Sequence, residues 1–173
     1  MNTIVTDTPL VNRIANSDLI TFDIESLYPK ESIILFDLKD FLFHGLILKE
    51  KEFREALKIY PWENLSGKIV AIHCSTDAIV PMWAYMLVAS HCFGLVKSIH
   101  FGDQEMAINA ELLKRIEALD MSNYLDKKVI IKGCSDQKLP EQVYPAISMK
   151  FLPYVKTLMF GEPCSTVPIY KRK

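Results

Sequence analysis

The sequence predicts an α/β protein: a single doubly wound, mostly parallel sheet with helices on both faces, built around a duplicated βαβ unit. Three observations lead to this prediction. Short β-branched runs alternate with helical patterns, which is typical of parallel strands joined by right-handed crossovers. Residues 63–103 resemble residues 122–162. The 173 residues, half of them hydrophobic, are enough for one domain, 1–173, with a sizeable core.

The first 62 residues are expected to extend this domain. The elements expected there are, in order, a short helix opening at Thr8-Pro9, an edge strand at "LITFDI", a strand at "SIILFDL" and a helix at "LKEKEFREALKIY". The helix assignment follows from apolar residues spaced so that Phe53, Ala56 and Leu57 face inward.

The two resembling segments match residue by residue. "NLSGKIVAIHCSTDAIVP" lies over "NYLDKKVIIKGCSDQKLP", with Cys74 matching Cys134 at an offset of 60 residues (134 minus 74). One deleted residue then makes the offset 59, and "LVKSIHFGD" matches "YVKTLMFGE". A shared strand–helix–strand pattern alone does not explain these identities, so we expect an internal duplication.

Each repeat predicts a strand, a loop, a helix and a second strand. "KIVAIHC" and "KKVIIKGC" are β-branched runs suited to strands covered on both faces. Pro81 and Pro140 lie where the helices begin, because proline suits a first helical turn. The apolar run 78–96 predicts a buried helix.

The segments outside the repeats follow from simpler patterns. Between the repeats, "GDQEMAINAELLKRIEALD" has the spacing of a helix with one apolar face. After the second repeat, residues 163–173 are expected to form a tail with a solvated basic end, "YKRK".

Charge and hydropathy argue against two classes of partner. The formal net charge of −1 argues against a dedicated nucleic-acid binder, which would carry a basic surplus. No stretch reaches the roughly 18 apolar residues of a membrane helix, and the N-terminus lacks the pattern of a signal peptide. We therefore expect a cytoplasmic protein without nucleic-acid or membrane partners, whose cysteines are not paired in disulfides.

Three Cys-Ser pairs, each followed by a proline, form the candidate site. They are Cys74-Ser75, Cys134-Ser135 and Cys164-Ser165. All three are expected at strand ends, on the carboxyl edge where open α/β sheets bind ligands. If the strands ending at Cys74 and Cys134 are neighbours, about 4.8 Å apart, the thiolates can converge on one ion. A sheet order that separates these strands would remove this argument.

These residues predict zinc or an iron–sulfur cluster. Cys74, Cys134 and Cys164 would be the ligands, with one further non-cysteine ligand. The hydroxyls of Ser75, Ser135 and Ser165 would support the cofactor by donating hydrogen bonds to the thiolates. Cys92, inside the apolar run, is expected to be an ordinary core residue.

Two alternatives stay open. A thiol-dependent enzyme or a persulfide sulfur carrier would also use cysteines at strand-to-helix turns, where the helix dipole favours the thiolate. The third possibility is a non-catalytic binding module with structural cysteines. Because no GxGxxG, GxxxxGK[ST] or HExxH motif is present, the sequence leaves open whether the protein is an enzyme.

Four strings of the sequence resemble a known family. They are "DLKDFLFHGLILKEKEFREAL", "CSTDAIVPMWAYM", "KGCSDQKLPE" and "GEPCSTVPIYKRK". They resemble the bacterial family catalogued as domain of unknown function 2480, from about Val11 to Lys173. The resemblance implies an accessory role beside iron–sulfur assembly proteins, because genes for cluster assembly neighbour those of the family. It implies no catalytic residues.

Overall fold

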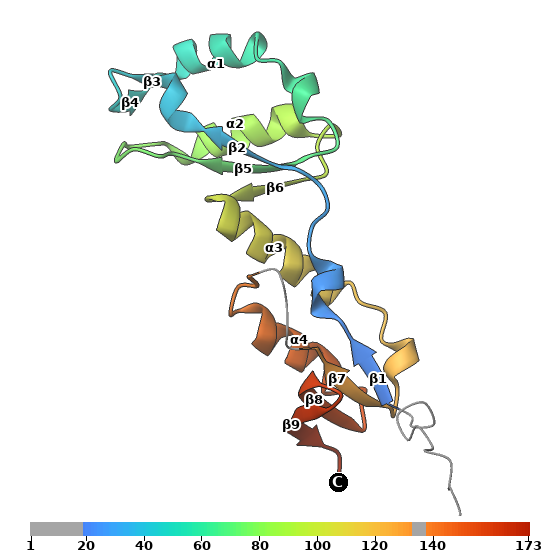
Figure 1. Ribbon diagram of the computed structural model, residues 1–173. Helices are drawn as coiled ribbons and strands as arrows, with labels where there is room; N and C mark the ends of the chain where they lie inside the picture. The colour runs from blue at the N-terminus through green and yellow to red at the C-terminus, as the bar shows by residue number, and fades with distance from the viewer. Residues whose placement is uncertain (1–18, 133–137) are drawn as a thin grey trace, which may run out of the picture. The chain divides into compact units, whose positions relative to one another are not determined.

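The computed structural model describes residues 19–132 and 138–173 (Figure 1). Contacts within the chain divide it into two compact units. The described part of the central unit is 25–119 and 138–147, and that of the terminal unit is 19–24, 120–132 and 148–173. The expected single domain, 1–173, stays a prediction.

The central unit contains a parallel sheet in the order β2-β5-β6. Its strands are β2 (Ile33–Asp37), β5 (Ile69–His73) and β6 (Ser98–Phe101), and its helices are α1 (Glu50–Lys58), α2 (Met82–Cys92) and α3 (Gln104–Glu117). Helix α1 connects β2 to β5, and α2 connects β5 to β6. Because both crossovers advance in one direction, α1 and α2 lie on one side of the strands and α3 on the other (Figure 1).

The alternation of side chains along β5 builds the core of the central unit. Val70 and Ile72 pack in one cluster with Phe53 of α1 and Val88 of α2. The opposite face is covered by α3, which contacts all three strands and buries Leu112. The continuous β-branched run of β5 therefore serves a strand buried on both faces, as expected.

Several further elements of the described chain are short. They are the antiparallel pair β3 (Leu42–Phe43) and β4 (Ile47–Leu48), and the 3₁₀ helices η1 (Ile24–Leu27), η2 (Leu38–Phe41), η3 (Trp62–Leu65) and η4 (Ser122–Tyr124). Their positions at the ends of longer elements are typical of 3₁₀ turns.

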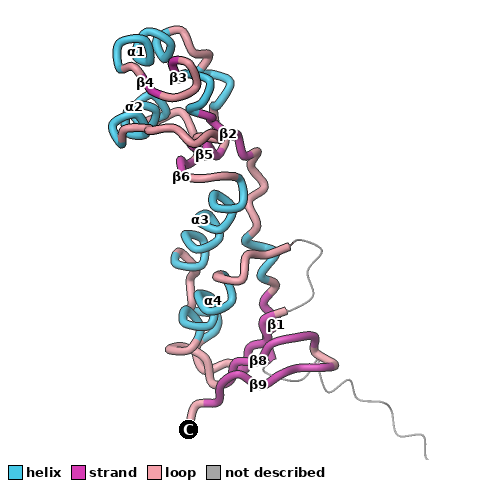
Figure 2. Tube along the Cα trace, turned by 90° about the vertical axis from the view of Figure 1, so that its left-hand side faces the viewer, coloured by secondary structure: helices cyan, strands magenta, loops and turns pink. Residues whose placement is uncertain are grey.

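The terminal unit contains a second sheet in the order β1-β7-β8-β9. Its strands are β1 (Leu19–Phe22), β7 (Lys128–Ile131), β8 (Thr157–Glu162) and β9 (Ser165–Lys171). The first three are parallel, and β9 runs antiparallel beside β8 (Figure 2). Helix α4 (Val143–Phe151) precedes β8, and the boundary between the two units falls within it.

A mixed α/β architecture with mostly parallel strands is confirmed, but the single sheet is wrong for the described residues. Strands β5 and β7, which begin the two repeats, belong to different sheets. They are separated because each strand pairs with a different N-terminal strand: β5 pairs with β2, and β7 pairs with β1. Each repeat thus completes a sheet with its own flanking strand. Double winding stays a prediction.

The two repeats, 63–103 and 122–162, have matching backbone contacts. Lys97 N donates to Lys68 O at 2.8 Å, and Lys156 N donates to Lys127 O at 2.8 Å. A left-handed residue precedes each strand, Gly67 in one repeat and Asp126 in the other. All these pairs are 59 residues apart (127 minus 68).

The strand register has the same offset and changes the expected alignment. Ile69 pairs with Ser98, and Lys128 pairs with Thr157, so the strands also match at an offset of 59 (128 minus 69), not 60. By number, Cys74 then corresponds to Gly133 rather than to Cys134. The duplication is supported by these contacts and remains a hypothesis.

The expected tail 163–173 is largely a strand. The pairs of β9 with β8 run from Glu162 and Ser165 to Thr157 and Lys171. Thr166, Val167 and Ile169 are β-branched and favour a strand here. Gly161 of β8 pairs with Thr166, and it has no room for a side chain, because its φ is 122° and an added Cβ would lie 2.5 Å from Ser165 O.

The helix α2 is not fully buried, contrary to the expectation for 78–96. Ala84 and Val88 are buried, whereas Met82 and Met86 are exposed. No helix in residues 19–132 and 138–173 is long and apolar enough to cross a membrane.

Candidate functional site

The cysteines have different environments. Cys74 follows β5 and is partly buried, while Cys164 is exposed between β8 and β9. Cys92 is buried in α2, and burial raises its pKa to about 11, so it is an inert core thiol as expected. Cys134 and Ser135 lie outside the described residues.

Cys74 lines a pocket at the carboxyl ends of β5 and β6. The pocket has a volume of about 480 Å³. Its lining includes Cys74 and Thr76 from the loop after β5, Met82 and Tyr85 from α2, and Gly102 and Asp103 at the start of α3. We call this space the Cys74 pocket. It occupies the edge at which open α/β sheets bind ligands.

The thiol of Cys74 has a polar neighbour. Its Sγ lies 3.5 Å from Oγ1 of Thr76. Pro81 precedes α2 without a side-chain cap, so the first N–H groups of this helix are not occupied by a capping side chain. The hydroxyl of Thr76 and the uncapped start of α2 thus both border the pocket beside the thiol.

Asp37 holds the loop that contains Cys74. This carboxylate ends β2, and its Oδ1 accepts hydrogen bonds from Ser75 N and Lys39 N, each at 3.0 Å. Burial raises the pKa of Asp37, but the hydrogen bonds from Ser75 and Lys39 outweigh burial and lower it to about 2. The ionised carboxylate thereby ties the loop after β5 to the neighbouring strand.

His73 is turned to the same carboxylate. Its Nε2 lies 3.9 Å from Oδ2 of Asp37, so the ring interacts with β2 although it also borders the Cys74 pocket. Ser75 uses its backbone N–H to support the loop. The predicted hydrogen bond from its hydroxyl to a thiolate stays a prediction.

The opposite wall of the pocket depends on Gly102 and Asp103. Gly102 has φ 109° and donates its N–H to Ile72 O at 2.9 Å, and an added Cβ would lie 2.9 Å from Met106 Cβ. Asp103 caps α3 by accepting a hydrogen bond from Met106 N at 2.9 Å. The chain can therefore turn sharply from β6 into α3 and leave room in front of Cys74.

The expectation that the strands before Cys74 and Cys134 are neighbours in one sheet is wrong. Cys74 follows a strand flanked by β2 and β6, whereas β7, the strand before Cys134, lies between β1 and β8 in the other sheet. Cys164 and Ser165 also belong to this second sheet, at the turn into β9. The described residues contain no group of three His, Cys, Asp or Glu side chains arranged to hold a metal ion. A joint site is a prediction that these residues do not test.

Comparison with known proteins agrees with the sequence resemblance. The family model described as "Protein of unknown function (DUF2480)" matches residues 8–172. The chain belongs to this family. No curated protein and no solved structure matches it. The function of this DUF2480 protein must therefore be argued from its own site.

Sequence reasoning identified Cys74 but missed the residues around it in the DUF2480 chain. Asp37, Tyr85 and Asp103 had no motif that marked them. One signal was present: Asp37 ends a strand run, "SIILFD", just as Cys74 ends another. Since parallel strands end at one edge, the residues after each run were candidates for the same site.

Proposed function

We propose that this DUF2480 protein is a sulfur carrier in which Cys74 accepts and passes on sulfane sulfur. The observation that carries the proposal is the thiol of Cys74 in a pocket of about 480 Å³ at the carboxyl edge of the sheet. A buried structural cysteine such as Cys92 has no such access.

The reaction is a thiol–persulfide exchange. The Cys74 thiolate attacks the outer sulfur of a neutral persulfide, R–S–SH, and the sulfur–sulfur bond of the donor breaks. The donor leaves as a thiolate and takes up the proton released from Cys74. The product is a Cys74 persulfide, and no external oxidant or reductant is needed. The reverse reaction delivers the sulfur to an acceptor thiolate.

The surroundings suit this chemistry. Thr76 can donate a hydrogen bond to an anionic sulfur, since its Oγ1 is 3.5 Å from Cys74 Sγ. Val80, Met82 and Phe101 contribute apolar side chains to the lining of the pocket. The hydrogen bond from Ser75 N to Asp37 keeps the loop in place while the thiol reacts.

The test is persulfide loading followed by intact-protein mass spectrometry. Wild-type protein incubated with a low-molecular-weight persulfide is expected to gain one sulfur atom on Cys74, and Cys74→Ser is expected not to. Cys164→Ser is the matched control, because it removes the exposed thiol at the β8–β9 turn. Equal loading of Cys74→Ser and wild type, or loading at Cys164 alone, would refute the carrier.

A second candidate function is the three-cysteine site. It would bind zinc or an iron–sulfur cluster through Cys74, Cys134 and Cys164, in a cytoplasmic accessory to iron–sulfur cluster assembly. The observation that favours it is that Cys74 and Cys164 are both free thiols following parallel strands and neither is fully buried.

Metal and acid-labile sulfide analysis after anaerobic purification separates the two functions. A shared site requires that Cys74→Ser, Cys134→Ser and Cys164→Ser each lose stoichiometric metal. If none of the three variants loses metal and Cys74 takes up persulfide sulfur, the result supports the sulfur carrier and not the shared metal site. If neither property is found, the remaining reading is a binding module with structural cysteines.

A further inference from the structure

Helix α2 is apolar on every side. Residues 78–96 contain no Asp, Glu, Lys or Arg. Ala84, Val88 and Cys92 form the inner side and are buried against the sheet. A helix that is hydrophobic all round is expected to be covered all round. Packing in the core therefore does not explain why the outer side of α2 is also hydrophobic.

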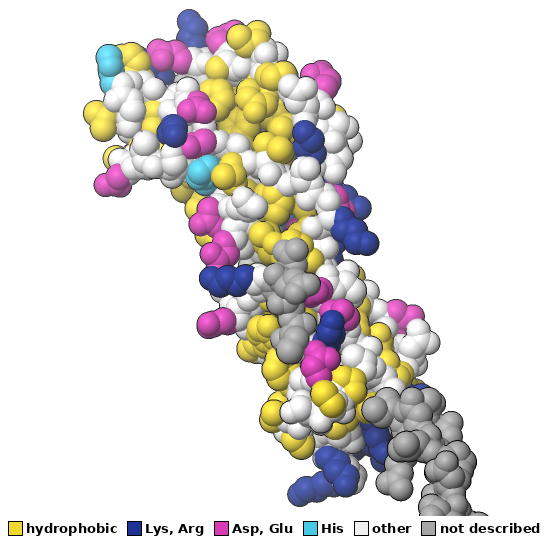
Figure 3. All heavy atoms as spheres, in the orientation of Figure 1, with side chains coloured by type: hydrophobic (Ala, Val, Ile, Leu, Met, Phe, Trp, Pro, Cys, Tyr) yellow, Lys and Arg dark blue, Asp and Glu magenta, His cyan; other side chains and the backbone are white. Residues whose placement is uncertain are grey.

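The outer side carries a row of large exposed side chains. Met82 and Met86 are spaced i and i+4, so they lie on one side of the helix, and Phe93 follows directly after its last residue. Their side chains are 70, 71 and 92 % exposed. We call these three residues, with exposed Ile79 before the helix, the α2 stripe. Figure 3 also shows hydrophobic side chains gathered at the surface around α1 and α2.

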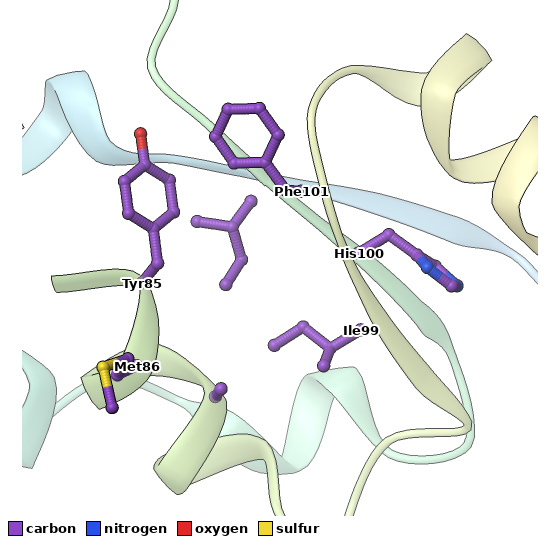
Figure 4. Close-up of a pocket in the computed structure, with 7 residues that line it drawn as sticks. Tyr85, Met86, Ile99, His100 and Phe101 are labelled. Atoms are coloured by element: carbon purple, nitrogen blue, oxygen red, sulfur yellow. The ribbon is translucent and has the colours of Figure 1, made fainter. Parts of the chain in front are cut away.

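A groove runs beside the stripe, between α2 and β6. It has a volume of about 250 Å³ and is lined by Tyr85, Met86, Ile99 and Phe101, among others. Figure 4 shows Tyr85 and Phe101 at one end, with Met86 and Ile99 further along. The two rings lie 5.3 Å apart between centroids. The α2 stripe forms a ridge, and this groove lies directly beside it on the same apolar face.

We propose that this face binds the same face of a second copy of the chain, around a two-fold axis. A two-fold interface needs a patch that complements itself. An apolar ridge beside an apolar groove meets this need, because the ridge of each copy can enter the groove of the other. Methionine side chains suit such a contact, since they are flexible and fill irregular gaps.

The exposed area fits a dimer interface. The stripe and Phe101 are 63 to 92 % exposed, and covering all five side chains would bury at most on the order of 800 Å² on each copy, about the area that each partner contributes to a standard interface. The largest apolar patch on a typical monomer is about 300–600 Å². The absence of charged residues from 78–96 also matches the depletion of charge at interface centres, and two copies meet there without repulsion.

The dimer would affect the Cys74 pocket without being part of the proposed sulfur chemistry. Met82 belongs both to the α2 stripe and to the wall of the pocket, and Phe101 borders both the pocket and the groove. A second copy on the stripe would therefore cover one rim of the pocket and restrict which sulfur donors can enter.

Sedimentation velocity over a range of protein concentrations tests the proposal. Wild type is expected to dimerise, and Met86→Lys is expected to weaken the dimer roughly 30-fold or more, because a charge would enter the centre of the contact. Met149→Lys is the matched control: Met149 lies on α4, is 69 % exposed and is outside the stripe. Its dissociation constant should equal that of wild type.

A second variant guards against misfolding of Met86→Lys. Ala89→Cys in a Cys164→Ser background places a thiol near the middle of the α2 face, and mild oxidation should then link two copies. A wild-type protein that stays monomeric, a dimer that Met86→Lys leaves intact, or no cross-link through position 89 in a dimeric sample would each overturn the proposal. So would protection of the stripe by a different protein or by another segment of the same chain.

Discussion

Cys74 can serve as a reactive thiol only if the loop after β5 keeps its position, and Asp37 is the residue that fixes it. The carboxylate accepts one hydrogen bond from Ser75 N in the loop and one from Lys39 N, two residues after Asp37 itself. Its pKa of about 2 reflects these contacts, which outweigh the opposing effect of burial. Stability and site geometry are thus coupled at one side chain.

Asp37→Asn should lower the free energy of unfolding by about 2 kcal/mol at pH 7, since a lowered pKa of this size corresponds to that stabilisation. The depressed pKa contributes stability above the ordinary pKa of aspartate, near 4, and loses it as the pH falls towards 2. Urea unfolding at neutral and acid pH measures this difference. Asp77→Asn, at an exposed position, should change stability by less than about 0.5 kcal/mol. Equal effects of both variants would contradict the assignment.

Glu111 of α3 is a buried carboxylate that does not line the Cys74 pocket. Its Oε1 accepts hydrogen bonds from Ser98 Oγ and lies 2.8 Å from His100 Nε2. Its Oε2 lies 3.4 Å from Arg115 Nε. Burial raises the pKa of Glu111, but the hydrogen bonds from Ser98 and His100 outweigh burial and lower it. These contacts join α3 to β6.

Removing this carboxylate should be costly. Glu111→Ala is expected to reduce stability by about 3 kcal/mol, because it removes the buried carboxylate that pairs with Ser98 and His100, while Arg115 keeps its ion pair with Glu31. Glu55→Ala is a suitable control, since Glu55 pairs with Lys58 on the exposed side of α1 and such pairs contribute less than about 1 kcal/mol. Chemical denaturation at pH 7 measures both. A loss below about 1 kcal/mol for Glu111→Ala would show that the network is not stabilising.

Among the elements, β9 differs most from its prediction, and its backbone approaches Gly161 of β8 closely. A charged segment at the end of a chain predicts a tail, yet β9 pairs with β8 along its length. The pairing also brings Lys171 and Arg172 beside Lys156 at the start of β8. The basic end is therefore part of a sheet edge, and Figure 3 shows Lys and Arg side chains gathered there.

Gly161→Ala should destabilise the hairpin by more than Gly94→Ala. Both glycines have left-handed backbones, but an added Cβ at Gly161 would collide with Ser165 O, whereas at Gly94 it would meet no atom within 4 Å. We expect about 3 kcal/mol for Gly161→Ala and about 1 kcal/mol for Gly94→Ala. Hydrogen exchange of the β9 amides should rise in the first variant only. Equal losses of stability would mean that the collision is relieved by movement.

At the scale of the whole molecule, each of the two compact units buries hydrophobic side chains of its own among the described residues. Phe36, Leu57 and Val88 belong to the central unit, and Phe22 and Leu158 belong to the terminal unit. Both tryptophans of the sequence, Trp62 and Trp83, lie in the central unit. Tryptophan fluorescence therefore reports on the central unit, while far-ultraviolet circular dichroism reports on both.

Leu158→Ala should separate the two units during unfolding. The cavity left in the terminal core is expected to cost about 3 kcal/mol. In a urea titration, the circular dichroism signal should then begin to change before the tryptophan fluorescence. Val88→Ala, in the central core, is the matched control and should move the fluorescence transition first. Coincident transitions in both variants would indicate one cooperative domain.

Local patterns in the sequence determined the elements of this protein. The β-branched runs around Val70 and Ile130, the apolar spacing around Phe53 and the prolines at 81 and 140 predict strands and helices that the structure contains. They do so because hydrophobic periodicity and backbone restriction act within a few residues. They also marked Cys74 as the end of a strand, and so as a candidate site residue.

Only the tertiary structure decided which strands pair and what surrounds Cys74. Strand β7 pairs with β1, more than a hundred residues earlier in the chain, and this choice put the two repeats in different sheets. Tyr85 and Gly102 line the Cys74 pocket from two separate segments, and Asp37 holds the Cys74 loop from a third. Pairing between distant strands depends on how whole surfaces pack, which no local pattern encodes. The exposed side of α2 appears for the same reason: its composition predicts burial, but its surroundings decide what is covered.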